Sequence, residues 1–122
     1  MTKRDFLKAG AATTLTALMT APALASFSRR IAVVQTGLPG ADAFARRERA
    51  AGATILEAKG DPVRWHVRVL RPALGRAEVV GYTDAAHAIL LEGSLREEGY
   101  VRSGPQRRSG RALLWQAAPR AA

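Results

Sequence analysis

Three polar residues follow a short apolar run near the middle of the chain, and their types and spacing could do acid–base chemistry. The run Val79–Val80 is typical of a buried strand, and Thr83, Asp84 and His87 come soon after it. If a helix begins there, Asp84 and His87 are three residues apart and share one helix face, where the carboxylate can raise the basicity of the imidazole. Such a pair could act as a general acid or base. The structural alternative is that Thr83 is the helix N-cap and His87 only covers the first turn.

A second loop carries two glycines that could lie beside these residues. Gly37 and Gly40 belong to the segment 35–40, which follows an apolar run at 31–34 and precedes a helical pattern. In an open α/β sheet, ligands bind at the carboxyl ends of the strands where the strand order reverses, and helix N-termini there favour an anion. The glycines could instead only permit tight turns, so both interpretations stay open. We predict a weak ligand-binding site formed by Gly37, Gly40, Thr83, Asp84 and His87.

Strand and helix patterns alternate along the chain, which predicts an α/β domain. We expect a small three-layer, doubly wound fold of the flavodoxin or Rossmann kind, with a mostly parallel sheet of about four or five strands in the order 2-1-3-4. The final strand is expected at the sheet edge, where it could run antiparallel. The expected strands lie at 31–34, 53–57, 79–80, 100–102 and 112–116, and the expected helices at 41–51, 61–74 and 83–98.

The helical spacing also predicts which side chains face the core. The third helix should bury Leu90, Leu91 and Leu95 on one face. Pro72 is expected to kink or end the second helix, because proline lacks an amide and crowds the preceding turn. The inward stripe expected in that helix is Val63, either His66 or Val67, then Leu70 and Leu74.

The first 25 residues have the pattern of an export signal. Residues 2–8 resemble the twin-arginine motif, with Lys3 in place of the first arginine, and a mildly apolar run at 9–20 leads to an A-x-A cleavage site. We predict a signal peptide at 1–25, a single domain at 26–117 and a frayed tail at 118–122, with the mature protein in the periplasm and the twin-arginine translocase as a partner during export. Because Lys3 departs from the motif, the general secretory route and retention in the cytoplasm stay open. The signal residues are Lys3, Arg4, Phe6, Leu7 and Lys8, and the cleavage residues are Ala23 and Ala25.

Beyond the signal, the chain resembles a group of short exported proteobacterial proteins. The resemblance rests on a Gly-Ala-Thr-Ile-Leu strand at 52–56, a Gly-Asp-Pro helix start at 60–62 and a Gly-Tyr-Thr turn at 81–83. It implies a Rossmann-like fold over about residues 30–103. These motifs are structural, so the resemblance implies no reaction.

Composition narrows the possible functions. The chain has no cysteine, which excludes disulfides and thiolate chemistry, and its two histidines lack metal-binding spacing. It also lacks a dinucleotide or P-loop motif, so we expect neither a cofactor nor a metal. Removing residues 1–25 lowers the basic count from 19 to 16 and the acidic count from 10 to 9, so the net charge falls from +9 to +7.

The basic charge favours a small anionic ligand or a periplasmic protein partner. The arginines are not interleaved with exposed aromatic residues, so nucleic acid is not an expected ligand. We therefore expect a non-enzymatic accessory or small-anion-binding module, with no catalytic residue assigned. The alternative is a small enzyme that uses Thr83, Asp84 and His87 at the strand-end crevice.

Overall fold

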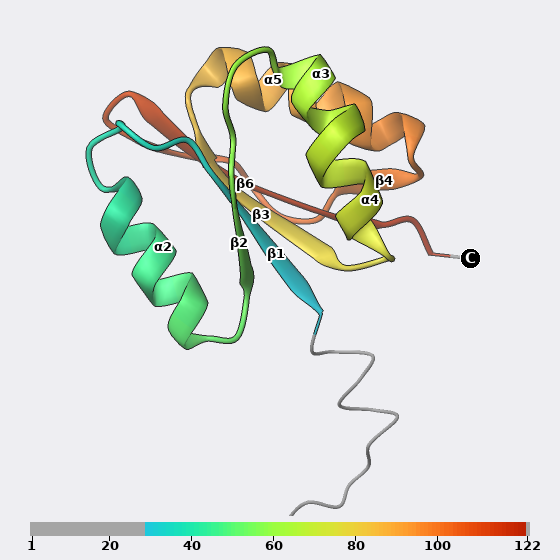
Figure 1. The fold of residues 1–122 in the computed structure, drawn as a ribbon, viewed down its shortest axis with the longest axis horizontal. Coiled ribbons are helices and arrows are strands. Elements are labelled where there is room, and N and C mark those ends of the chain that lie inside the picture. Colours follow the sequence, from blue (N-terminus) through green and yellow to red (C-terminus); the bar gives the residue numbers. More distant parts are fainter. Residues whose placement is uncertain (1–28, 122) are drawn as a thin grey trace, which may run out of the picture.

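The computed structural model describes residues 29–121, so the predicted signal peptide lies outside the described residues. Helices cover both faces of a six-stranded sheet (Figure 1). The helical segments are α2 (Ala41–Ala50), α3 (Pro62–Trp65), the π-helix η2 (His66–Leu70), α4 (Arg71–Leu74) and α5 (Ala85–Glu97). The strands are β1 (Arg30–Val34), β2 (Thr54–Glu57), β3 (Glu78–Thr83), β4 (Tyr100–Arg102), β5 (Arg107–Ser109) and β6 (Ala112–Pro119).

The sheet is mixed, with the strand order β2-β1-β3-β6-β4 and β5 paired to β6. The parallel core β2-β1-β3 has the predicted order. The expected order 2-1-3-4 is wrong beyond β3, because β6 lies antiparallel between β3 and β4, and β5 adds a third antiparallel pairing to β6. The sheet is therefore not mostly parallel, and the final strand is central instead of at the edge.

Gly81 leaves room for Trp115 where β6 lies beside β3. The two residues are register partners, and a Cβ atom built on Gly81 would lie 2.0 Å from the Trp115 ring. Only glycine leaves room for the indole at this position. A hairpin turn at Gly110, which has a φ of 62°, joins β5 to β6, and β5 is a strand that the sequence analysis does not predict. The strand then continues to Pro119, two residues into the expected tail.

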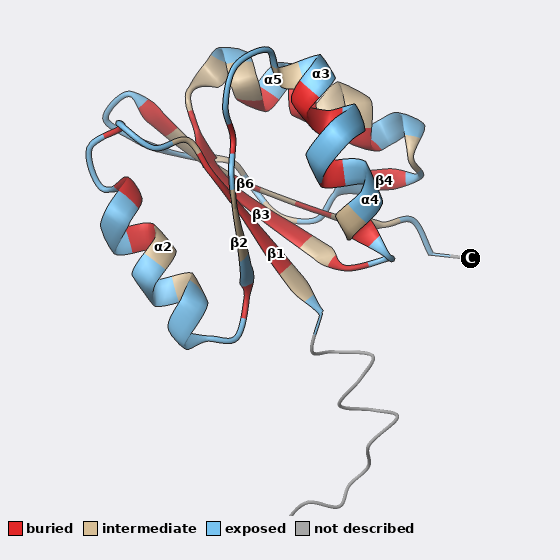
Figure 2. Ribbon diagram, in the orientation of Figure 1, coloured by how far each residue is buried: buried red, intermediate tan, exposed pale blue. Residues whose placement is uncertain are grey.

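Two apolar clusters fill the space on either side of the sheet (Figure 2). On one face, α2 contributes Ala41 and Phe44, and the Phe44 ring stacks on Tyr82 with centroids 5.2 Å apart. On the other face, α3 to α5 bury leucines and Trp65 against the opposite side of the same strands. Because both of their faces are covered, β1 and β3 have continuous apolar runs and do not alternate.

Two details of the helices differ from the sequence expectation. In α5, Leu91 and Leu95 are buried but Leu90 is 44% exposed. Neighbouring residues of an α-helix are rotated by about 100° around its axis, so Leu90 does not share the buried face of Leu91. In the preceding segment, His66, Leu70 and Leu74 are buried, whereas Val63 and Val67 are exposed, so the expectation that Val63 faces the core is wrong.

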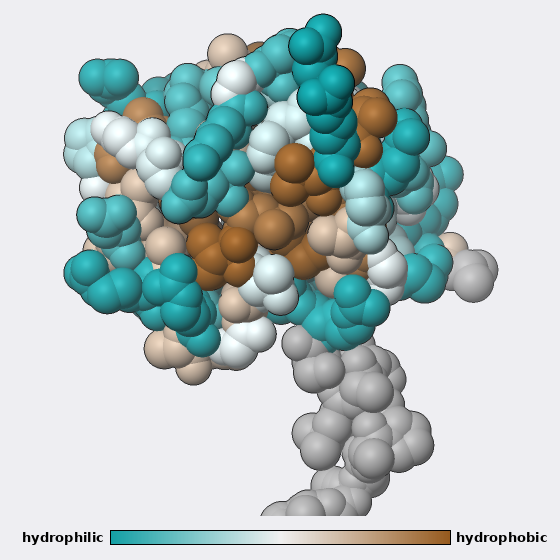
Figure 3. Space-filling view, in the orientation of Figure 1, coloured by the Kyte–Doolittle hydropathy of each residue, from teal (hydrophilic) through white to brown (hydrophobic). Residues whose placement is uncertain are grey.

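Pro72 does not end the second helical segment, which continues to Leu74. The wider turn of η2 directly before it gives room for a ring that would crowd an ordinary α-helical turn. Within residues 29–121, no helix is long and apolar enough to cross a membrane. Figure 3 shows apolar side chains gathered in the middle of the face where β2 lies, between α2 and the α3–α4 segment.

Candidate functional site

Asp84, directly after β3, is the N-cap of α5. Its Oδ1 atom accepts a hydrogen bond of 2.8 Å from the backbone N–H of His87. The expectation that Thr83 would be the cap is wrong, because β3 continues through Thr83 and the helix begins one residue later than that expectation requires. The Asp84 carboxylate thus supplies an acceptor to an amide that an external anion would have used.

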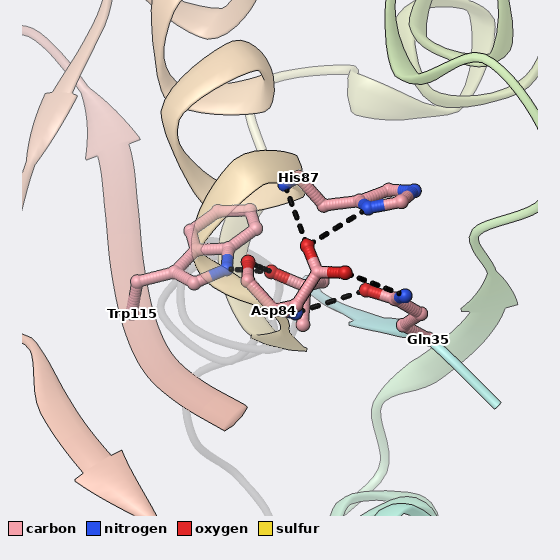
Figure 4. A network of polar contacts seen from close by, with 5 residues as sticks. Gln35, Asp84, His87 and Trp115 are labelled. Atoms are coloured by element: carbon pink, nitrogen blue, oxygen red, sulfur yellow. Dashed lines mark hydrogen bonds and ion pairs between the residues drawn. The ribbon is translucent and has the colours of Figure 1, made fainter. Parts of the chain in front are cut away.

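Gln35, directly after the carboxyl end of β1, is joined to Asp84 by two hydrogen bonds (Figure 4). The Gln35 amide Nε2 donates to Asp84 Oδ2 over 3.0 Å, and the backbone N–H of Asp84 donates to Gln35 Oε1 over 2.9 Å. These two bonds join the ends of neighbouring parallel strands. We did not single out Gln35 from the sequence, because a lone glutamine at a strand end gives no signal without knowledge of its neighbour.

The predicted contact between Asp84 and His87 is present. His87 Nδ1 lies 3.0 Å from Asp84 Oδ1, and the histidine side chain is 19% exposed. The backbone N–H of His87, and then the side chains of Gln35 and His87, hold the pKa of Asp84 below its ordinary value. The spacing of three residues within the first helical turn therefore predicted a real contact, although Asp84 has other partners too.

Thr83 is fully buried, and its hydroxyl both accepts and donates a hydrogen bond. The hydroxyl accepts a hydrogen bond of 3.0 Å from Trp115 Nε1 and donates one of 3.0 Å to the carbonyl oxygen of Asp84. A buried indole N–H usually needs such a partner. The side chains of Gln35, Thr83, Asp84, His87 and Trp115 together form what we call the carboxyl-end junction.

The two predicted glycines differ in their surroundings. Gly40, with a φ of 88°, begins α2, and a Cβ atom built there would collide with the hydroxyl of Tyr82, which donates to the carbonyl of Pro39. Gly37, with a φ of 96°, has nothing within 4 Å of such a Cβ atom. The structure therefore brings the loop at 35–40 against β3 and the start of α5. Whether a ligand binds there stays a prediction.

An arginine-lined hollow lies at the other end of these strands from the carboxyl-end junction, near the amino ends of β1 and β3. It encloses about 470 Å³ and is lined by Arg71, Arg76 and Arg120, together with Gly75, Glu98 and Tyr100. The guanidinium of Arg29 lies over Gly75, since its Nη1 atom is 2.8 Å from a Cβ atom built there. We call this cluster the arginine hollow.

Positive charge in the arginine hollow exceeds negative charge. Glu98 is the carboxylate in the lining, and its Oε2 atom already lies 2.7 Å from Arg71 Nε and 3.3 Å from His66 Nε2. The hydrogen bonds from Arg71 and His66 hold the pKa of Glu98 below its ordinary value. Within residues 29–121, no carboxylate lies within 4 Å of the guanidinium groups of Arg29, Arg76 or Arg120.

The backbone beneath the hollow is held in place. The hydroxyl of Tyr100 donates a hydrogen bond of 2.6 Å to the carbonyl of Ala77, and burial raises the pKa of Tyr100. Arg76 has a φ of 66°, the only positive value for a residue other than glycine in the described part of the chain. Strained backbone of this kind is more common where a ligand or a functional side chain must be positioned.

Sequence reasoning missed this hollow because its arginines are far apart in the chain and each resembles an ordinary surface residue. A metal centre is not visible in the described range, where no group of three or more metal-binding side chains gathers. No protein-family model, curated protein or solved structure matches this chain.

Proposed function

We propose that this protein is an exported, non-enzymatic module that binds a small anion in the arginine hollow. The observation that carries the proposal is the excess of guanidinium groups around one carboxylate that is already paired. Arg29, Arg76 and Arg120 have no carboxylate within 4 Å among residues 29–121, and cations that are crowded into a concave site repel one another unless an anion relieves the repulsion. The hollow thus offers what the helix end at Asp84 does not, which is positive charge in excess of the one carboxylate in its lining, Glu98.

The chemistry of guanidinium suggests the class of ligand. Its planar fork donates two parallel hydrogen bonds to a carboxylate or a phosphate, so arginines arranged around one space favour such oxyanions. A volume of about 470 Å³ is large enough for inorganic phosphate or a small dicarboxylate. The open, solvent-facing positions of Arg76 and Arg120 favour reversible binding.

Calorimetric titration of the full chain with phosphate, and separately with a small dicarboxylate, tests this proposal. Arg76→Gln and Arg120→Gln should each weaken binding by about fivefold or more, because each removes one charge-assisted contact. Arg107→Gln and Arg108→Gln are matched controls, since they remove the same charge from exposed positions on β5. Equal affinity in all four variants would mean that only the net charge attracts anions.

The export part of the proposal rests on the sequence of residues 1–25. The twin-arginine translocase would be the partner during export, and the mature chain would begin at Ser26 in the periplasm. Mass spectrometry of a periplasmic extract should find that N-terminus, and Arg4→Lys should abolish the periplasmic form. An intact Met1 end in the periplasmic extract, or export in a strain that lacks the translocase, would contradict this route.

The second candidate is a small enzyme of the carboxyl-end junction, and the 3.0 Å contact between His87 Nδ1 and Asp84 Oδ1 favours it. A carboxylate that orients a histidine is a common arrangement for proton transfer. The Thr83 hydroxyl, held between Trp115 and the Asp84 carbonyl, is better placed for a structural role than for attack on a substrate. Binding of an anion that strengthens as His87 becomes protonated, and that is lost in His87→Gln, would favour this candidate. We also propose that the β2-β1-β3 core is the central part of a doubly wound, Rossmann-like arrangement.

A further inference from the structure

β2 is an edge strand whose outer side has no strand partner within residues 29–121. It pairs with β1 on one side only, and its four residues are exposed or half-buried. Apolar side chains gather around it in Figure 3, bordered by hydrophilic ones. Among the apolar residues here, Ile55 packs on the α2 side and Leu56 on the other side, each only partly covered. A sheet edge of this kind offers both main-chain hydrogen bonds and apolar area.

The register shows which peptide groups face outward. The backbone N–H of Ala58 donates to the carbonyl of Val34 over 2.8 Å, so Ala58 faces β1. Side chains and peptide groups alternate along a strand, so Leu56 also directs its peptide groups toward β1. Ile55 and Glu57 therefore direct their N–H and C=O groups away from the sheet, and these four groups are spaced for an antiparallel partner.

We propose that this edge pairs with β2 of a second copy of the chain, antiparallel and centred on Leu56. In that register, Ile55 of one copy and Glu57 of the other exchange both main-chain hydrogen bonds. The two Leu56 residues lie directly opposite each other and cover one another's exposed area. The pairing is self-complementary, as a two-fold interface must be.

The position of α2 supports a second copy as the occupant. This helix packs over both β1 and β2. Neighbouring strands lie about 4.8 Å apart, so two such helices, each centred over its own strand pair, would lie about 10 Å apart across the interface. That is the separation of packed helices. The sheet could therefore extend through β2 without a clash or a gap between the α2 helices.

Charges along α2 are also complementary under the same two-fold axis. Asp42, Arg46 and Arg49 line a hollow of about 220 Å³ beside Ile55 and Glu57. Asp42 lies in the first turn and Arg49 in the last, so antiparallel α2 helices would place each Asp42 opposite Arg49 of the second copy. Glu57, which now lies 3.4 Å from Lys59, would approach Arg46 of the second copy. An unrelated extended peptide would not by itself need this arrangement of charges.

Sedimentation velocity of the full chain over a range of concentrations tests the proposal. A reversible dimer is expected, and Asp42→Arg and Arg49→Asp should each weaken it by about tenfold. The double variant, which exchanges the two charges, should restore the affinity. Arg108→Asp on β5 is the matched control and should leave the dimer unchanged. A monomer at every concentration, a dimer indifferent to these charges, or a double variant no better than the single ones would overturn the proposal.

Hydrogen exchange measured at the same concentrations provides a readout at the edge itself. The amides of Ile55 and Glu57 should exchange quickly in the monomer and slowly in the dimer. Slow exchange at concentrations where the protein is monomeric would mean that another segment of the chain, such as residues 1–28, covers the edge, and this result would also overturn the proposal. Fast exchange in a confirmed dimer would place the interface elsewhere and overturn it as well.

Discussion

Polar side chains are hydrogen-bonded to one another at one end of the parallel β2-β1-β3 core, whereas guanidinium groups outnumber carboxylates at the other end. At the carboxyl-end junction, the Asp84 carboxylate, the Gln35 amide and the Thr83 hydroxyl are hydrogen-bonded to neighbouring groups of the same domain. At the arginine hollow, guanidinium groups gather around Glu98, which is already held by Arg71 and His66. The first arrangement lowers the energy of the folded chain, whereas the second gathers more guanidinium groups than carboxylates among residues 29–121.

This difference shows why residue types alone are a poor guide to a binding site. Thr, Asp and His beside two glycines have the chemistry of a functional site, yet their hydrogen bonds hold a strand end, a helix start and β6 together. The arginines of the hollow carry no motif, yet Arg29, Arg76 and Arg120 have no carboxylate within 4 Å in the described part of the chain. We therefore expect substitutions at the junction to change stability, and substitutions at the hollow to change ligand binding.

Trp115→Ala should give the largest loss of stability. It removes a fully buried ring packed over Gly81 and leaves Thr83 without its indole donor, which should cost about 3–5 kcal/mol of unfolding free energy. Arg120→Ala in the hollow should change that free energy by no more than about 0.5 kcal/mol. Urea denaturation followed by circular dichroism compares the two variants. Similar losses would erase the distinction between the two regions.

Asp84→Ala should cost less than Trp115→Ala but more than a neutral surface change. The variant loses the cap of α5 and the contact with the Gln35 amide, together worth about 1–2 kcal/mol. Glu97→Ala is the control, because Glu97 is an exposed carboxylate in the last turn of the same helix, far from its N-cap. If the two variants unfold at the same urea concentration, the Asp84 contacts contribute little to the fold.

Arg76→Gly should stabilise the domain while it weakens anion binding. Glycine adopts a φ of 66° without the penalty that other residues have, so a gain of about 0.5–1 kcal/mol is expected. The loss of a guanidinium should at the same time lower the affinity for phosphate. Thermal denaturation and calorimetry on one preparation measure both quantities. A gain in stability without a loss of affinity would remove Arg76 from the site.

The smallest effect should be a change in the pH dependence of stability. Folding lowers the pKa of Asp84, so the folded state favours its charged form. The stabilisation of the folded state by the charged Asp84 is fully present above the ordinary aspartate pKa of 3.8 and is lost as the pH falls through the lowered pKa. Melting temperatures of Asp84→Asn should therefore fall less steeply than those of the parent below about pH 4. Parallel curves would mean that the Gln35 and His87 contacts do not favour the carboxylate.

The parallel half of the fold could be predicted because its signals are local. Apolar runs such as Val79–Val80 and the start signal Asp61–Pro62 depend only on neighbouring residues, and both are confirmed. The place of β6 depends on Trp115 meeting Gly81, a contact between residues 34 positions apart that no local pattern contains. This is why a strand expected at the edge lies in the middle of the sheet.

The same reasoning explains what could be anticipated of the two sites. The Asp84–His87 contact follows from the three-residue spacing within one helical turn, so the sequence predicts it. The bonds from Gln35 and Trp115 connect separate elements, and only the folded chain reveals that they occupy the same groups. The arginine hollow depends on the turn at Gly75, the start of β4 and the end of β6, so its residues could not be grouped in advance.

Backbone amide NMR during a phosphate titration of the full chain compares the two regions most directly. If the hollow binds the anion, the largest shifts should fall at 75–76, 98–100 and 120–121, and they should shrink in Arg76→Gln but not in His87→Gln. Shifts confined to 36–40 and 82–87, which vanish in His87→Gln, would contradict this result. They would place the anion at the carboxyl-end junction instead.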